Sequence, residues 1–365
     1  MKYIHDLEKI ITINSYTKNK EGVDKVGEIM SLWLEDIGFE TTVYERDLIG
    51  NHLLHTTSKK ANLPKILLLG HNDTVFPPNT FEGFNKDEQW IYGPGVCDMK
   101  GGNIVALQAL RNIYETNRAI HNIDFLLVSD EESGSDDSKN LSSSIAKNYD
   151  YCFVFEAAGI KEEVVNARKG VGTFTIDIEG LAAHAGNNYE KGVDANLEAS
   201  YKLQELVKLT NLKKGTTCNV GKIKGGIGAN TISPKASITL EIRYTQNEEK
   251  NRLLSALHDI CNTSYVEGSK AVLSGAIQRD VMEANDKQEL LITKIEAISG
   301  EKLFCEKRGG VSDANIIASQ GTTTLDGFGP FGDGDHTVKE RACLKSFEKR
   351  INLMTQILSH FQVSK

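Results

Sequence analysis

Histidines and acidic residues that could bind a metal ion follow short apolar runs of this sequence. The runs are 66–70, 123–128 and 151–155, and the residues that follow them are His71, Asp73, Glu131, Glu132 and Glu156. Imidazole and carboxylate groups are common zinc ligands. An aspartate two residues after a histidine can also fix the ring tautomer that binds the metal. The alternative for each pattern taken alone is a solvated turn at a strand end.

Two adjacent glutamates, Glu131 and Glu132, could have different roles in a metal-dependent hydrolase. One can bind the metal while the other acts as general base, because neighbours in a turn point in different directions. The alternative is an ordinary acidic surface. Glu156 abuts an apolar run, where a carboxylate needs a partner to offset the cost of its desolvation.

Glycine-rich segments contain two further candidates. Asp98 lies in residues 93–102, ahead of a helix predicted from about Ile104, and His336 ends residues 332–336. Glycines allow close backbone approach and unusual dihedral angles, which a carboxylate wedged between two cations requires. Asp98 could instead simply cap the helix.

The elements that must position these residues alternate along the chain. The three apolar runs are typical of strands buried on both faces of a parallel or mixed sheet. Amphipathic helices are predicted over residues 23–38 and 104–114. This alternation predicts an α/β fold with helices on both sides of the sheet. Ligand sites of such folds collect at the carboxyl ends of the strands, where the candidate residues lie.

The pattern changes after Ala167. Strands are predicted at 172–179, 218–223 and 236–244, and helices at about 195–209 and 248–262. These elements favour an inserted α+β domain whose sheet has one open face. We therefore expect a discontinuous catalytic domain, residues 1–167 plus 283–365, and an inserted domain, residues 168–282.

Charge and composition argue against several classes of partner. The 365 residues contain 42 Lys and Arg against 50 Asp and Glu, a net charge of −8, so no basic face for nucleic acid is predicted. No run approaches the roughly 20 apolar residues of a membrane-spanning helix, and the charged amino terminus does not fit a signal peptide. The six cysteines are scattered, without a C-x-x-C pair. These features predict a cytoplasmic protein without nucleic-acid or membrane partners.

Taken in order, the motifs resemble those of the M20 metallopeptidase family. The resemblance rests on His71-x-Asp73, Gly95-x-x-Asp98-x-Lys-Gly-Gly, Glu131-Glu132-x-Gly134-Ser135, Glu156 and His336. It spans nearly the whole chain and is strongest to the glutamate carboxypeptidase and acetylornithine deacetylase branches. It implies a zinc-peptidase-like α/β/α catalytic domain with an inserted ferredoxin-like domain that acts in dimerisation or as a lid.

The resemblance also implies two Zn²⁺ ions per subunit. His71 and Glu156 would bind the first ion, Glu132 and His336 would bind the second, and Asp98 would bridge them. Such mixed nitrogen and oxygen ligands could also hold Co²⁺ or Mn²⁺.

Neighbouring residues would support this centre. By the same resemblance, Asp73 would orient His71, Glu131 would be the general base, and the peptide bond from Asp98 to Met99 would be cis.

The inserted domain contains three more candidates. The segment Gly180-Leu-Ala-Ala-His184-Ala-Gly resembles a lid motif whose histidine reaches the active site of a partner subunit. His184 would then stabilise the oxyanion within a homodimer. Asn230 and Arg243 resemble substrate contacts of the family. An arginine suits a terminal carboxylate, although on a strand Arg243 could equally form a surface ion pair.

The expected activity is hydrolysis of an amide bond in a small peptide-like substrate, with release of a carboxy-terminal amino acid such as glutamate. One alternative is an N-acyl-amino-acid deacylase of the acetylornithine or succinyl-diaminopimelate type. Another, from a different class, is a non-catalytic binding protein on the same fold. Such a protein should lack a ligand or the base, and all of them are present in this sequence.

Overall fold

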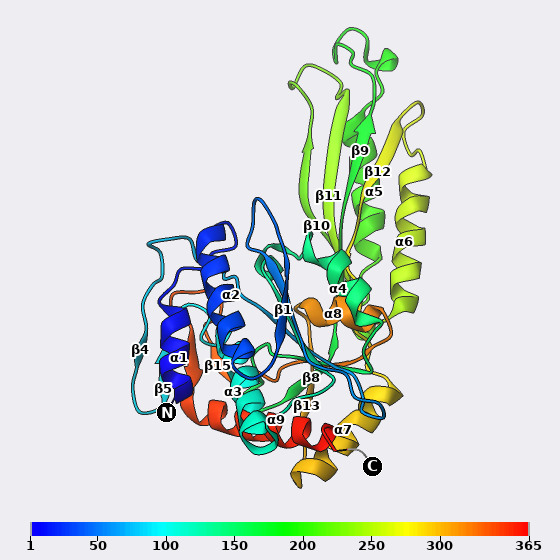
Figure 1. Ribbon diagram of the computed structural model, residues 1–365. Coiled ribbons are helices and arrows are strands. Elements are labelled where there is room, and N and C mark those ends of the chain that lie inside the picture. Colours follow the sequence, from blue (N-terminus) through cyan, green and yellow to red (C-terminus); the bar gives the residue numbers. More distant parts are fainter. Residues whose placement is uncertain (1, 364–365) are drawn as a thin grey trace. The chain divides into compact units, whose positions relative to one another are not determined.

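The computed structural model describes residues 2–363, which divide into two compact units (Figure 1). The first unit comprises Met1–Ala167, Ala284–Arg308 and Ser312–Lys365, and the second comprises Arg168–Glu283 and Gly309–Val311. The sequence placed Gly309–Val311 in the catalytic domain. This segment groups with the second unit because Arg168 and Arg243 donate hydrogen bonds to the carbonyls of Gly310 and Gly309.

A six-stranded mixed sheet forms the centre of the first unit. Its strands, in spatial order, are β1 (Glu40–Tyr44), β2 (His52–Thr56), β6 (Ile123–Val128), β3 (Ile66–His71), β7 (Tyr151–Val154) and β14 (Thr323–Leu325). Strands β6, β3, β7 and β14 run parallel, and β1 and β2 complete the sheet as an antiparallel pair. Both β3 and β6 are buried along their whole length, as their continuous apolar runs predict.

Helices cover both faces of this sheet, as the sequence predicted (Figure 1). The main core packs on one face, and it includes apolar residues of α1 (Lys2–Ile11), α2 (Lys20–Glu35), α3 (Lys100–Asn117), α7 (Asp286–Ser299) and α9 (Leu344–Phe361). On the other face, α4 (Ser138–Ala146) packs against α8 (Asp313–Ser319), which lies on β7 and β14. Within residues 2–363, every helix is too short or too polar to cross a lipid bilayer. The cytoplasmic location stays a prediction.

Short strands beside the main sheet hold the segments that precede and follow the predicted ligand loops. A four-stranded sheet has the order β15 (Gly332–Asp333), β16 (Arg341–Cys343), β5 (Trp90–Tyr92) and β4 (Asn85–Lys86). A separate pair joins β8 (Val164–Arg168) to β13 (Cys305–Arg308). Because β5 leads into the glycine-rich turn and β15 and β16 flank the His336 loop, one small sheet holds both segments.

The second unit has the βαββαβ order of a ferredoxin-like domain, in agreement with the sequence. Its elements are β9 (Gly170–Glu179), α5 (Ala195–Lys208), β10 (Thr217–Gly225), β11 (Lys235–Tyr244), α6 (Asn247–Asn262) and β12 (Lys270–Arg279). The sheet is antiparallel, with the order β10-β11-β9-β12. Burial alternates along β9 and β11 because one face of the sheet packs against α5 and α6.

Candidate metal centre

The carboxyl ends of three parallel strands bring candidate ligands to one edge of the main sheet. His71 is the last residue of β3 and pairs with the last residue of β6. Glu131 and Glu132 begin the short 3₁₀ helix η1 (Glu131–Ser133), which follows β6. Glu156 comes two residues after the end of β7, which pairs with β3 on its other side. The sheet register therefore places these candidate residues on neighbouring strand ends.

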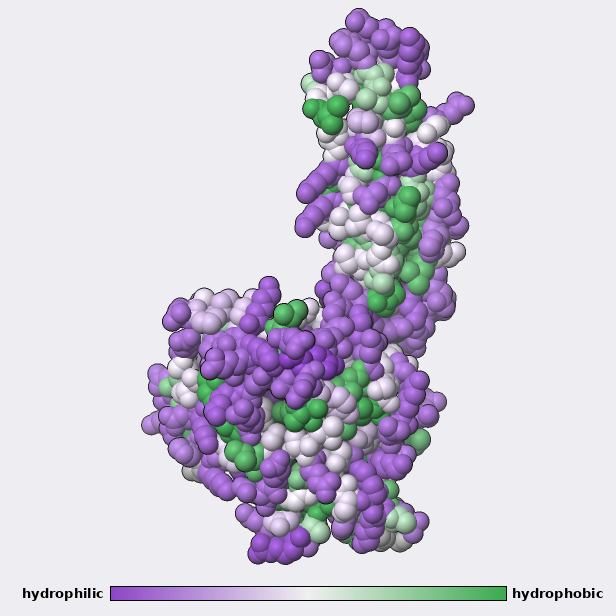
Figure 2. Space-filling view, turned by 45° about the horizontal axis from the view of Figure 1, so that its top comes forward, coloured by the Kyte–Doolittle hydropathy of each residue, from purple (hydrophilic) through white to green (hydrophobic). Residues whose placement is uncertain are grey.

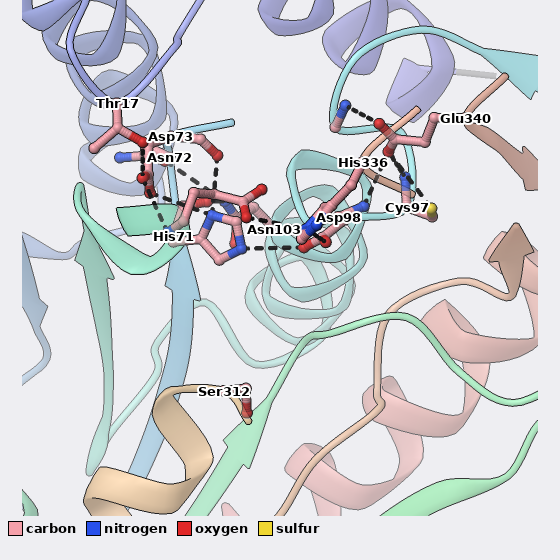
Figure 3. Close-up of polar contacts among 12 residues, drawn as sticks. Thr17, His71, Asn72, Asp73, Cys97, Asp98, Asn103, Ser312, His336 and Glu340 are labelled. Carbon is pink, nitrogen blue, oxygen red and sulfur yellow. Dashed lines mark hydrogen bonds and ion pairs between the residues drawn. The ribbon is translucent and has the colours of Figure 1, made fainter. Parts of the chain in front are cut away.

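The carboxylate of Asp98 lies between two imidazole rings (Figure 3). Its Oδ1 is 3.2 Å from Nε2 of His71, and its Oδ2 is 3.2 Å from Nε2 of His336. The same Nε2 of His336 is 3.1 Å from Oε2 of Glu132. Ligand atoms of His71, Asp98 and Glu132 all lie within 4.8 Å of one another. A carboxylate with one oxygen toward each imidazole has the arrangement needed to bridge two cations.

The second ring nitrogen of His71 fixes the orientation of this side chain. Nδ1 lies 3.0 Å from the backbone carbonyl oxygen of Asp73 and 3.4 Å from its Oδ1. Because a carbonyl oxygen can only accept, Nδ1 carries a hydrogen, and in the neutral ring Nε2 keeps its lone pair toward Asp98. This tautomer is the one that binds a metal ion.

Asp73 also connects the histidine to the turn that carries the two glutamates. Its Oδ2 accepts hydrogen bonds from Oγ1 of Thr17, at 2.7 Å, and from the backbone N–H of Glu132, at 3.2 Å. Thr17 and Asp73 are both buried. One carboxylate thus holds β3, the η1 turn and the segment before α2 together.

Burial and mutual repulsion oppose ionisation of the clustered glutamates. Burial, followed by the negative charge of Asp98, raises the pKa of Glu132 to about 8. The same two causes raise the pKa of Glu156 well above its usual range. Hydrogen bonds to Asp98 and Glu132 raise the pKa of His336 to about 11. Burial opposes ionisation of Asp98 as well, but its hydrogen bonds to His336 and His71 outweigh burial and lower its pKa.

This donor set fits divalent metal ions. Glu156 is only 9% exposed, and within residues 2–363 its carboxylate has no hydrogen bond or ion pair. A buried carboxylate without a partner is costly, and a bound divalent cation supplies the missing positive charge. Carboxylate oxygens and imidazole nitrogens are also the donors that zinc accepts.

The turn that carries Asp98 packs tightly against its surroundings. The peptide bond from Asp98 to Met99 is cis, as the family resemblance implied. Helix α3 begins at the next residue. A Cβ atom on Gly101 would lie 2.0 Å from the carbonyl oxygen of Val96, and one on Gly102 would lie 1.9 Å from that of Phe155. Only glycine allows α3 to start this close to the residue before Glu156.

The other predicted site residues lie in the second unit. His184 is exposed, and its Nδ1 accepts hydrogen bonds from the backbone N–H groups of Gly186 and Asn187, at 3.1 and 3.2 Å. Nε2 of the neutral ring therefore carries the hydrogen. Asn230 is a neighbour of His184, because its carbonyl accepts from the N–H of Ala185 at 3.0 Å.

Arg243 forms an ion pair, which is one of the two roles that the sequence allowed for this residue. Its Nε is 2.7 Å from Oε1 of Glu241, and its Nη1 donates to the carbonyl of Gly309 at 2.9 Å. The ion pair and a substrate contact are compatible, because an arginine has five N–H donors.

A comparison with models of known protein families identifies the family to which the chain belongs. The model of peptidase family M20/M25/M40 matches residues 67–360. The chain belongs to this family. As an M20 protein it is a hydrolase of the metallopeptidase and amidohydrolase class.

Individual M20 relatives differ in the substrates that their names state. Carboxypeptidase G2 from Pseudomonas sp. (strain RS-16) is 27% identical over 97% of this M20 chain and 88% of its own length. A succinyl-diaminopimelate desuccinylase from Ehrlichia canis (strain Jake) is 23% identical over 82% of each protein.

Solved structures share the fold of this M20 enzyme. Aminopeptidase PepT from Bacillus cereus superposes with a TM-score of 0.82 at 22% identity, covering 98% of both chains. A Bacillus subtilis protein described as a dinuclear metal-binding M20 peptidase has a TM-score of 0.72 at 12% identity, covering 100% of this chain and 98% of its own.

The sequence did not reveal two buried residues beside the centre. Thr17 contacts Asp73, and Glu340 contacts the backbone of the Asp98 turn. Spacing gives no signal for Thr17. Glu340 follows His336 by four residues, which is the only hint that the sequence contains.

Proposed function

We propose that this M20 enzyme is a two-zinc hydrolase of the carboxypeptidase type, which cleaves an amide bond of a small peptide-like substrate and releases a carboxy-terminal amino acid such as glutamate. The observation that carries the proposal is the carboxylate of Asp98 between His71 and His336. Similarity to carboxypeptidase G2 over nearly the whole chain supports this substrate class.

Five residues of the first unit would hold the metal ions. His71 and Glu156 would bind one ion, Glu132 and His336 would bind the other, and Asp98 would bind both. When bound, Zn²⁺ supplies Lewis-acid chemistry, which polarises the substrate carbonyl and lowers the pKa of water toward about 7.

Proton transfer falls to Glu131. This buried residue is adjacent to the ligand Glu132 in the η1 turn, so its carboxylate can work beside the centre without being a ligand. It takes a proton from the attacking water and passes it to the nitrogen of the departing amine.

Residues of the second unit would recognise the substrate. Nε2–H of His184 donates to the oxyanion that forms on the substrate carbonyl. The remaining N–H groups of Arg243 bind the terminal carboxylate, and Asn230 contacts the substrate backbone.

His184 would act in the active site of a second copy of this chain. Strands β10 and β12 are the two edges of the second unit's sheet, and unpaired edges favour pairing with another chain. Exposed apolar side chains such as Leu212, Ile227 and Val272 add to the surface of this unit, where Figure 2 shows apolar atoms. These features support a homodimer.

An assay of the Glu131→Gln variant with zinc analysis tests the proposed function. The wild type should bind two Zn²⁺ per chain, release carboxy-terminal amino acids and lose its activity on chelation. The variant should bind the same amount of zinc but lose about 10²–10⁴-fold in turnover, because only the proton transfer is removed. Unchanged turnover would exclude Glu131 as the base, and full activity after chelation would exclude the metal mechanism.

A second candidate is deacylation of an N-acyl amino acid. The similarity to a succinyl-diaminopimelate desuccinylase over 82% of the chain favours it, and so does the similarity to an N-acetyl-L-citrulline deacetylase from Xanthomonas campestris. A panel of acetylated, succinylated and glutamyl substrates distinguishes the two, since only one group should be hydrolysed efficiently.

A further inference from the structure

Glu340 is buried against the turn that carries Asp98 (Figure 3). Its Oε2 accepts a hydrogen bond from the backbone N–H of Gly95 at 2.9 Å. Its Oε1 accepts from the backbone N–H groups of Cys97, at 3.0 Å, and of Asp98, at 3.2 Å. One carboxylate therefore satisfies three backbone donors of a single turn.

Within residues 2–363, these three N–H groups have no backbone acceptor, whereas the N–H of Val96 donates to the carbonyl of Gly93 at 3.2 Å. Gly93 and Gly95 have φ values of 152° and 84°, which residues other than glycine rarely adopt. Backbone N–H groups that converge in such a turn form a concave anion site. Hydrogen bonds to a carboxylate are about twice as strong as neutral ones, so Glu340 determines where the backbone of Asp98 lies.

The same residue belongs to the segment that carries His336. Its backbone N–H donates to the carbonyl of Thr337 at 3.1 Å, and its carbonyl accepts from the N–H of Gly93 at 3.5 Å. His336 itself has a φ of 60°, a region that is unusual for residues other than glycine. Glu340 therefore joins the two segments: its backbone belongs to the His336 loop, and its side chain accepts hydrogen bonds from the Asp98 turn.

An ordinary structural ion pair does not explain Glu340. It has no ion-pair partner in the part of the chain that the structure describes. The nearby buried Lys100 instead donates to the carbonyls of Ile10 and Ile13, at 3.0 and 2.9 Å. A buried carboxylate without a cation is costly. The three backbone hydrogen bonds of Glu340 offset this cost.

We propose that Glu340 is a positioning residue that sets the metal affinity of the centre. It holds Asp98 and His336, which are distant in sequence, in one arrangement before any metal binds. This inference rests on the proposed two-metal centre, because it assigns a role to a residue that supports two of its ligands.

The zinc dissociation constant of the full-length protein tests this role. Metal-free wild type, Glu340→Ala and Glu340→Gln would be titrated with Zn²⁺ in competition with a chromophoric chelator. We expect Glu340→Ala to raise the dissociation constant about 10–100-fold, the usual effect of removing a residue that orients a ligand. Glu340→Gln should have a smaller effect, because it keeps the size of the side chain and one acceptor oxygen.

Asp124→Asn is the control for the loss of a buried carboxylate, although Asp124, unlike Glu340, also pairs with Lys59. Asp124 is 2% exposed and accepts a hydrogen bond from the backbone N–H of Thr57 at 3.0 Å. It lies at the start of β6, the end opposite the η1 turn. This variant should lower the stability of the metal-free protein and leave the zinc dissociation constant unchanged.

Two results would overturn the inference, and they distinguish a wrong role for Glu340 from a wrong metal centre. If both Glu340 variants bind zinc as tightly as wild type, Glu340 is a structural brace only; should Glu340→Ala fail to fold, Glu340→Gln decides. If the wild type binds no zinc, or if His71→Ala binds it equally well, the metal centre itself is wrong and the role of Glu340 falls with it.

Discussion

At the scale of single residues, Arg243 forms an ion pair and keeps N–H donors for the substrate contact that we propose. Its Nε and Nη2 face the carboxylate of Glu241, and its Nη1 donates to Gly309. Three of the five N–H donors of the guanidinium are engaged. The remaining two stay directed by these contacts, since Glu241 and Gly309 hold the plane of the group fixed.

Replacing Arg243 with lysine should therefore impair substrate binding. A lysine keeps the positive charge but loses the planar fork that binds a carboxylate through two hydrogen bonds. We expect KM to rise about 10-fold or more with little change in kcat, measured by steady-state kinetics on a substrate with a free carboxylate. The amide analogue of that substrate is the control, because its KM should be the same for both proteins.

His55 should make the stability of the protein depend on pH. This β2 residue is fully buried, and burial lowers its pKa to about 3. In the unfolded chain a histidine titrates near 6.5. Between these two values only the unfolded state takes up the proton, so the stabilisation is complete above pH 6.5 and is lost as the pH falls toward 3.

The free energy of unfolding should thus fall by about 1.4 kcal/mol per pH unit through this residue between pH 6 and 4. Urea unfolding of the metal-free wild type and of His55→Leu, measured across this range, isolates the effect. The variant should show the shallower slope, and parallel curves would show that His55 does not titrate as described.

At the scale of elements, the centre depends on how closely α3 approaches the end of β7. Gly102 leaves no room for a side chain. A Cβ atom added to it would lie 1.9 Å from the carbonyl oxygen of Phe155 and 2.9 Å from the Cβ of Phe155. Phe155 immediately precedes Glu156. A shift of α3 would therefore move a proposed metal ligand.

Gly102→Ala should destabilise the protein although alanine favours helices. Overpacking costs about 1–3 kcal/mol, and a Cβ 1.9 Å from a backbone oxygen belongs to the upper part of this range, above the roughly 1 kcal/mol gained from helix propensity. Thermal unfolding would measure the change. Gly310→Ala is a suitable control, because no atom lies within 4 Å of its Cβ position, and a Gly102→Ala protein as stable as this control would contradict the packing argument.

The sequence predicted the elements whose hydrophobic pattern is strong. The runs at β3, β6 and β7, buried on both faces, and the alternating strands β9 and β11 have such a pattern. Strand β12 was missed because most of it is exposed at the sheet edge. Helix α9 was not predicted, although its buried residues Phe347, Ile351, Met354 and Leu358 recur at helical spacing. No pattern reports that Glu340 accepts hydrogen bonds from a turn more than 200 residues earlier.

At the scale of the whole molecule, the proposed homodimer has a consequence that can be measured. If His184 serves the partner's centre, each active site contains Glu131 of one copy and His184 of the other. A mixed dimer of a Glu131→Gln chain and a His184→Ala chain would then contain one complete site and one site lacking both groups.

Mixing the two inactive variants should restore activity. After subunit exchange, half of the dimers are mixed and each has one working site, so roughly a quarter of the wild-type rate is expected. Sedimentation equilibrium should give twice the chain mass of 40.2 kDa. No recovery after proven exchange would show that His184 does not act across subunits, and a fully active monomer would exclude the shared site.

A pair of hydrogen bonds joins the segment that enters the second unit to the segment that leaves it. The N–H of Arg168 donates to the carbonyl of Met282 at 3.0 Å, and the N–H of Met282 donates back at 3.1 Å. Residues paired in this way have Cα atoms about 5.5 Å apart, a gap that a two-residue turn spans. The insertion can therefore be treated as an exchangeable domain: residues 169–281 could be replaced by a short hairpin turn, or by another domain with adjacent termini, while Arg168 and Met282 keep their pairing.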